Sequence, residues 1–545
     1  MKIKSTWLLV YTISFFFTGC SNMKEPVDII VVHGNIYAVD SLNSRYDGMV
    51  IDDGKIVALG ISSQLENRYK ATRVLDAKGM TIMPGFVDAH CHFLGFALNQ
   101  QYVDLTGAHS MDEMVDRLKK AADTLPGFWV TGRGWDQNLW EVKEFPDRSE
   151  LDQLFPDRPV VLVRIDGHSV LCNEKALTLA GIGVVNKFKP GEVEIKRGKL
   201  TGILSENAAD FMRNSVPLPD ISVKQMLLKE AEKRCFSVGL TLVSDAGLEY
   251  PDVRLMDSMQ QSGFLKMRIY AMLSPTSENL NGFVFQGPYK TDRLMVRSVK
   301  LYTDGSLGSR TALMKEPYQD APEKRGILVT SPDSIREVCA LAYKNGYQVN
   351  THAIGDSAIR LILEIYGSFL KGKNDLRWRV EHAQVVDKAD FHLFSDYSII
   401  PSVQATHATS DMYWAGDRVG PERISGAYAY KELLDQNGWL PNGTDFPIEK
   451  ISPLLTFYAA VARKDLNGYP ETGFQMENAL SRDEALRSIT IWAAKAGFME
   501  DQCGSLEVGK KGDFVILEKD IMTAPITDIP KIKVLQTYIQ GERVY

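Results

Sequence analysis

The chain has 545 residues, too many for one ordinary domain but suitable for a large barrel with a smaller satellite domain. Hydrophobic residues make up 44% of it and charged residues 24%, which are ordinary values for a globular protein. The net charge is −7 and there is no block of basic residues, which argues against nucleic acid as a partner.

The N-terminus has the order of a secretory signal. Lys2 and Lys4 precede an apolar run, residues 7–17, that is too short to span a membrane. The next residues, Thr18-Gly19-Cys20, resemble the end of a bacterial lipobox, although Phe17 stands where leucine is usual. We therefore expect residues 1–19 to be removed and Cys20 to be lipidated. The product would be an exported lipoprotein, membrane-anchored at the periplasmic or cell-surface face. The alternative is an ordinary signal peptide with a chance cysteine.

Strand-like sequences mark both ends of the mature chain. Residues 27–39 and 49–59 alternate or run apolar, and Asp53-Gly54 within the second stretch is a hairpin signal. Residues 512–517 and 533–545 are also strand-like. We expect residues 20–82 and 501–545 to build one small β domain, with the large domain inserted between them. Two unrelated terminal hairpins are the alternative.

Residues 83–500 alternate strands with helices, which predicts βα units and a parallel sheet. The predicted strands are 159–166, 240–245, 266–273, 296–302, 347–352, 377–382, 399–404 and 439–445. The predicted helices are 111–124, 223–236, 333–344, 357–370 and 482–496, the last opening with a capping box at Ser481 and Glu484. Residues 127–218 fit this alternation badly and are predicted to be an insertion above the barrel mouth that contacts substrate.

Five cysteines follow Cys20, and they are scattered without a Cys-x-x-Cys pattern. Their odd number and wide spacing argue against a disulfide framework, even in an exported protein. We expect most of them to be small core residues.

His90 and His92 stand at the end of the apolar stretch that begins at Met83. Alternate side chains of a strand share a face, so both imidazoles point the same way and could grip one metal ion. A pair of histidines packed at a strand terminus is the alternative for this motif taken alone.

Four further strand ends carry groups suited to metal. Lys300 lies on an apolar strand, while His352, His382 and Asp445 each end a predicted strand. Taken singly, each residue is weak evidence for a functional site, because a lysine on a strand usually extends its amine to solvent and Gly-Thr-Asp is a common turn. Together they recur at the carboxyl ends of successive strands, the face on which barrel enzymes build their sites.

This ordered set resembles the amidohydrolase superfamily, and in particular the branch that includes N-substituted formamide deformylases and exoenzyme regulatory proteins (amidohydrolase family 3). The resemblance covers essentially the whole mature chain, including Asp304-Gly-Ser-Leu-Gly-Ser-Arg310 and Glu381-His382. It implies an α/β fold: a distorted (β/α)8 TIM barrel with a small β-sandwich domain. It also implies two divalent metal ions, bridged by a carboxylated lysine and a hydroxide.

Carried over to this chain, the resemblance implies that His90, His92 and Asp445 hold the more buried metal. His352 and His382 would hold the more exposed one. Lys300 would react with carbon dioxide to form the bridging carbamate, since an ammonium would be repelled by two cations. Asp445 would act as general base and then general acid. Zinc is the expected metal, and the donors also suit manganese, iron or cobalt.

Three residues are weaker candidates for binding substrate. His168 could contact the substrate or be a structural loop histidine. Arg310 could bind a carboxylate or pair with a nearby acid. Trp135 could line the pocket or pack in a core. The histidines without a motif are expected to be structural: His33, His109, His392 and His407.

We expect a metal-dependent hydrolase of a non-peptide C–N bond, most simply an amide of a small molecule. The rivals are a cyclic amidase, a deaminase or an esterase that uses the same site. A catalytically silent binding or regulatory protein on this fold is a further rival, although the complete ligand set argues against it. The oligomeric state is open, with a homodimer among the options.

Overall fold

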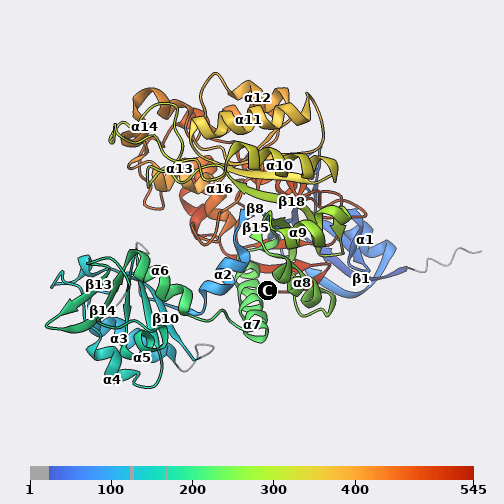
Figure 1. The fold of residues 1–545 in the computed structure, drawn as a ribbon. Helices are drawn as coiled ribbons and strands as arrows, with labels where there is room; N and C mark the ends of the chain where they lie inside the picture. Colours follow the sequence, from blue (N-terminus) through green and yellow to red (C-terminus); the bar gives the residue numbers. More distant parts are fainter. Residues whose placement is uncertain (1–23, 123–127, 166–167, 186) are drawn as a thin grey trace, which may run out of the picture.

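Figure 1 shows the computed structural model of the protein, which describes residues 24–122, 128–165, 168–185 and 187–545. These residues form a barrel, a small β domain and a separate lobe. The predicted signal peptide and Cys20 lie outside the described residues. Within the described residues, we find no helix with the length and apolarity needed to cross a bilayer. The five later cysteines are all buried and free, in agreement with the prediction.

The two chain ends build one small β domain of two sheets. A four-stranded sheet has the order β5-β4-β1-β6, and a six-stranded sheet has the order β24-β23-β22-β7-β2-β3. Apolar side chains from both ends fill the space between them, including Ile36, Ile51 and Phe514. The elements are β1 Glu25–Val32, β2 Asn35–Tyr37, β3 Arg45–Tyr46, β4 Gly48–Asp52, β5 Lys55–Gly60, α1 Ser62–Arg68, β6 Tyr69–Asp76, β7 Thr81–Pro84, β22 Phe514–Leu517, η5 Ile526–Lys531, β23 Val534–Ile539 and β24 Glu542–Arg543.

The predicted hairpin forms between β4 and β5. Asp52 pairs with Lys55 across the turn, and both intervening residues have a positive φ, 47° at Asp53 and 70° at Gly54. This left-handed conformation at both positions matches the right-handed twist of the two strands, and Asp-Gly adopts it readily.

Seven parallel strands form the wall of the barrel, in the order β21-β20-β19-β18-β16-β15-β8. Every residue of β8, β16 and β20 is buried, as expected of parallel strands covered on both faces. The strands are β8 Phe86–Cys91, β15 Leu240–Leu248, β16 Arg268–Leu273, β18 Leu294–Tyr302, β19 Gln348–Ala353, β20 Arg379–His382 and β21 Ile400–Ser402, with β17 Tyr289–Lys290 pairing beside β18.

Helices follow and surround the strands of this wall (Figure 1). They are α2 Phe93–Asn99, α7 Ile221–Ser237, α8 Tyr250–Gln261, α9 Ser277–Gly282, η2 Val284–Gln286, α10 Pro332–Lys344, α11 Asp356–Leu370, α12 Phe391–Asp396, α13 Ala405–Asp411, α14 Ala415–Arg423, η3 Ile424–Gly426, α15 Tyr430–Asn437, α16 Pro453–Ala462, η4 Met476–Asn478, α17 Arg482–Ser488 and α18 Ile491–Ala496. The predicted capping box is present at Ser481 and Glu484. The single helix predicted for 482–496 is instead two, because Thr490 has a non-helical backbone conformation.

The stretch 439–445, predicted as the last strand, closes the barrel without forming a regular strand. Asn442 pairs with Val403, the residue after β21, and on the other side the Asp445 amide donates to the His90 carbonyl at 2.8 Å. The closing stretch and the end of β8 approach so closely that a Cβ on Gly443 would lie 2.5 Å from the backbone nitrogen of His90. Only glycine fits there, so this residue sets Asp445 beside the end of β8.

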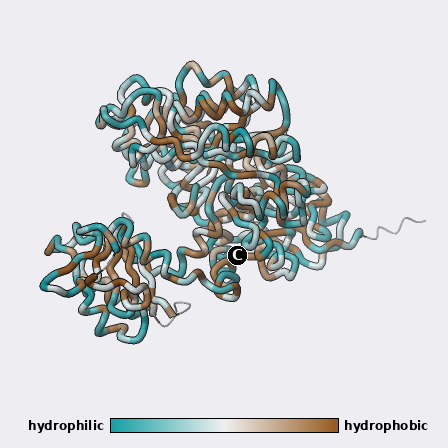
Figure 2. The backbone as a smooth tube through the Cα atoms, in the orientation of Figure 1, coloured by the Kyte–Doolittle hydropathy of each residue, from teal (hydrophilic) through white to brown (hydrophobic). Residues whose placement is uncertain are grey.

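A lobe of its own lies between α2 and α7. Its mixed sheet has the order β13-β14-β12-β11-β10-β9, and two apolar cores pack on its faces. Figure 1 shows the lobe to one side of the barrel, and Figure 2 shows hydrophobic segments inside both parts. The elements are β9 Tyr102–Asp104, α3 Met111–Ala122, β10 Val130–Trp135, η1 Gln137–Leu139, α4 Ser149–Leu154, β11 Val160–Arg164, β12 Ser169–Cys172, α5 Glu174–Ala180, β13 Val193–Lys196, β14 Lys199–Ser205 and α6 Glu206–Ser215.

The lobe corrects the predicted bounds of the insertion, residues 127–218. The insertion begins at β9, because α3 packs on β9 and β10 rather than on the barrel. The predicted strand 159–166 is β11, in the lobe sheet. Parallel strands followed by helices occur in both sheets, and the local pattern does not tell which sheet a strand joins.

Candidate metal centre

Five of the six residues predicted as metal ligands lie near the carboxyl ends of the barrel strands, and Asp445 ends the stretch that closes the barrel. His90 and Lys300 are almost completely buried, and His92 and His352 are partly open to solvent. The ring centroids of His90 and His382 are 5.0 Å apart, and those of His352 and His382 are 4.6 Å apart. Side chains from strands far apart in sequence therefore converge on one place.

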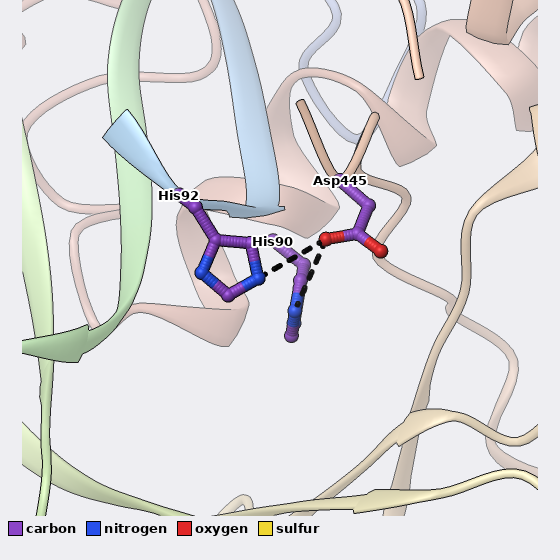
Figure 3. Close-up of side chains that lie close together, drawn as sticks. All are labelled: His90, His92 and Asp445. Atoms are coloured by element: carbon purple, nitrogen blue, oxygen red, sulfur yellow. Dashed lines mark ion pairs between the residues drawn. The ribbon is translucent and has the colours of Figure 1, made fainter. Parts of the chain in front are cut away.

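Figure 3 shows His90, His92 and Asp445 facing one another. Oδ1 of Asp445 lies 3.3 Å from Nε2 of His92 and 3.8 Å from Nε2 of His90. Nδ1 of His92 donates to the carbonyl oxygen of Ala246 at 3.2 Å, which leaves Nε2 with a free lone pair. Two imidazole nitrogens and one carboxylate oxygen, all within reach of one ion, form a typical donor set for zinc.

A buried acid holds His90 in the matching orientation. Nδ1 of His90 donates to Oε2 of Glu381 at 2.5 Å, so its Nε2 points into the centre. Arg379 in turn binds both oxygens of Glu381, at 2.6 and 2.9 Å. A carboxylate that orients a ligand histidine is a common feature of metal sites. Glu381 therefore explains why the predicted motif is Glu-His rather than histidine alone.

Lys300 reaches the same centre from β18. Its Nζ lies 3.2 Å from Nε2 of His90, and the residue is 1% exposed. Burial lowers the pKa of Lys300 to about 8. At neutral pH its amine is therefore uncharged far more often than an ordinary lysine amine.

One ring nitrogen of His352 and one of His382 bind residues outside the centre. Nε2 of His352 donates to the carbonyl of Gly305 at 3.2 Å, and Nδ1 of His382 donates to Oε1 of Gln404 at 2.6 Å. Asp304 fixes the loop that carries Gly305, because its carboxylate accepts the amides of Leu313 and Gly355 at 2.9 and 2.8 Å. Each histidine keeps one ring nitrogen free.

The electrostatics of the centre favour cation binding. Burial and the nearby Lys300 lower the pKa of His90 to about 4 and that of His352 to about 3. Burial raises the pKa of Asp445, but the nearby His92, His90 and His407 outweigh it and lower that pKa to about 2. The centre thus offers neutral imidazoles and an ionised carboxylate, the forms that bind metal.

Two donor atoms of the centre, Oδ1 of Asp445 and Nε2 of His407, are among the buried side-chain atoms that lack a hydrogen-bond partner in the described residues. Such atoms are rare in folded proteins and call for an explanation. A divalent metal ion would satisfy both, so the residues present fit the metal that the sequence predicts.

His407, which was expected to be structural because it carries no motif, also lies in this centre. It lies on α13, just after β21, and its Nε2 is 3.6 Å from Oδ2 of Asp445. One signal could have found it. The end of the predicted strand 399–404 was the only late strand end without a metal-suited group, and a histidine follows three residues later.

The three weaker candidates lie outside the centre. Trp135 is fully buried in the lobe core, where its Nε1 donates to the carbonyl of Leu162, so it does not line a pocket. Arg310 forms two hydrogen bonds to Asp320, at 3.0 and 2.8 Å, and is therefore already paired. His168 is exposed on the lobe, 3.4 Å from Glu206. Trp135 therefore packs in a core, and Arg310 pairs with a nearby acid, as the alternatives for these two residues predicted.

A barrel with histidines, a lysine and an aspartate at its strand ends defines the class of metal-dependent hydrolases. Comparison with known proteins gives the family. Residues 73–545 match the model described as "Amidohydrolase family", so the chain belongs to the amidohydrolase family and is a hydrolase.

Similar proteins span nearly the whole chain. It is 31% identical to Protein LONG AFTER FAR-RED 3 of Arabidopsis thaliana, over 95% of this chain and 91% of that protein. It is 25% identical to N-substituted formamide deformylase of Arthrobacter pascens, over 95% and 98%. An uncharacterized metal-dependent hydrolase from Pyrococcus furiosus has a similar structure, with 30% identity, a TM-score of 0.77, and coverage of 91% of this chain and 100% of that one.

Proposed function

We propose that the protein hydrolyses a non-peptide amide C–N bond of a small molecule. The observation that carries this proposal is the placement of Lys300. Lys300 is 1% exposed among the histidines and Asp445 of the centre, and its amine lies 3.2 Å from Nε2 of His90. Such a lysine is suited to reaction rather than to ion pairing.

Lys300 would react with carbon dioxide. The neutral amine attacks the carbon, an N–C bond forms as one C=O π bond opens onto oxygen, and the nitrogen releases one proton to solvent, so that a neutral side chain becomes an anionic carbamate. Its lowered pKa makes the attacking form available near neutral pH. The product offers two oxygen donors where an ammonium would repel cations.

Two divalent metal ions, zinc or alternatively manganese, iron or cobalt, would be held by the carbamate together with the histidines and Asp445. When bound, they would supply an acidified water and a polarised substrate carbonyl. Asp445 would take the proton from the attacking water and return it to the leaving nitrogen. Glu381 would keep His90 in its binding orientation throughout.

The choice of an amide draws on the relative from Arthrobacter pascens, whose printed name is N-substituted formamide deformylase. The test is a screen of purified protein loaded with zinc. N-substituted formamides, N-acyl amines, hydantoins, aminopurines and simple esters are offered in parallel, with chelator-treated protein as control. Metal-dependent release of formate or another acid from an open-chain amide is the expected result. Ring opening, ammonia release or ester cleavage alone would instead favour the cyclic amidase, the deaminase or the esterase.

We also propose that the protein is exported and anchored through lipid on Cys20. The charged start, the short apolar run and Thr18-Gly19-Cys20 support this. A small-molecule substrate outside the cytoplasm fits both proposals.

A further inference from the structure

We propose that His407 is a metal ligand, and that it forms with His382 and Asp445 a metal position separate from the one made by His90 and His92. Asp445 would then serve both positions, one through each carboxylate oxygen. The inference rests on the proposed metal-dependent function. His407 belongs to none of the ligands that the resemblance implies.

The two oxygens of Asp445 face different histidines. Oδ1 lies 3.3 Å from Nε2 of His92, whereas Oδ2 lies 3.6 Å from Nε2 of His407. Figure 3 shows the second oxygen pointing away from His90 and His92. The donor atoms of His382, His407 and Asp445 all lie within 4.8 Å of one another, as do those of His90, His92 and Asp445. The carboxylate therefore stands between two complete three-donor groups.

The ring nitrogens of this second group are free to bind. Nδ1 of His382 donates to Gln404, so the lone pair of its other nitrogen is available. Nε2 of His407 is buried and lacks a hydrogen-bond partner. The two rings are nearly parallel, with an interplanar angle of 22° and centroids 5.8 Å apart. A structural histidine would be expected to use that nitrogen in a hydrogen bond.

Asn442 connects the two segments that carry His407 and Asp445. Oδ1 of Asn442 accepts the amide of Ala405, the first residue of α13 and two residues before His407. Asn442 also belongs to the closing stretch that ends at Asp445 and pairs with Val403. The placement of His407 relative to Asp445 is therefore built into the closure of the barrel.

The test is metal binding to chelator-treated protein rather than turnover. Cobalt(II) is titrated into the wild-type protein in the presence of bicarbonate, and into His407→Ala and His407→Gln, while the visible absorption of bound cobalt is recorded. His392→Ala is the matched control, because His392 is an exposed histidine on α12 whose ring pairs with Asp396. Circular dichroism confirms that each variant is folded, and the glutamine variant is used if the alanine variant is not.

The wild-type protein and the control are expected to bind two cobalt ions. Both His407 variants should keep one tight ion and bind the other at least about 10-fold more weakly, the lower end of what loss of a supporting group costs a metal site. Two unchanged ions in the variants would overturn the inference, even if amide turnover fell, and would leave the proposed function standing. A wild-type protein that binds no metal would overturn both.

Discussion

Carbamate formation on Lys300 can be tested before any substrate is known. The pKa of this lysine is lowered from 10.5 to about 8 by burial. The fraction of neutral amine changes tenfold per pH unit below the pKa, so roughly a tenth of the side chains are neutral at pH 7, against roughly one in 3,000 for an ordinary lysine. This difference of about 300-fold is the reactive advantage that burial confers.

The assay is ¹³C NMR of chelator-treated protein incubated with ¹³C-labelled bicarbonate, between pH 6 and pH 9. We expect one carbamate signal whose rate of appearance, at a fixed concentration of dissolved carbon dioxide, rises with pH and levels off above about pH 8, because the neutral amine is the attacking form. Lys300→Ala should lose the signal, and Lys388→Ala, which removes an exposed lysine, should keep it. A signal that survives in Lys300→Ala, or one that is absent from the wild-type protein even with metal restored, would refute the reasoning.

Four further changes have defined expectations. Asp445→Asn cannot accept a proton, so kcat should fall about 10²–10⁴-fold in fully metallated protein, and a value within a few-fold of wild type would remove Asp445 as the base. Glu381→Gln weakens the orientation of His90 and should lower metal affinity about 10–100-fold in a competition titration, an effect that unchanged affinity would contradict. Trp135→Ala should destabilise the lobe by about 3–5 kcal/mol in urea unfolding while metal stoichiometry stays constant, because its ring packs only in the lobe core. Cys20→Ser should abolish incorporation of labelled lipid, and wild-type protein that is itself soluble and unlabelled would rule out the anchor.

The positions of the candidate ligands could be predicted from sequence because each depends on a local rule. His90 and His92 share a face through the two-residue period of a strand, and the other donors end strands whose apolar runs are easily recognised. The family resemblance then gave their order along the barrel. Glu381 was visible in the motif, although its role as the partner of His90 needed the distance between β8 and β20.

Tertiary structure alone decided the rest. Trp135 lies in a glycine-rich stretch that suggests a pocket, yet it packs in a core made by strands from elsewhere in the lobe. His407 has no motif, because its place beside Asp445 depends on how the closing stretch meets β21. The start of the insertion could not be predicted from sequence either. The sequence of α3 is that of an ordinary amphipathic helix, and only its contacts with β9 and β10 show which sheet it covers. Sequence determines which face of an element is apolar or carries donors, but contacts between distant segments are set by how whole elements pack.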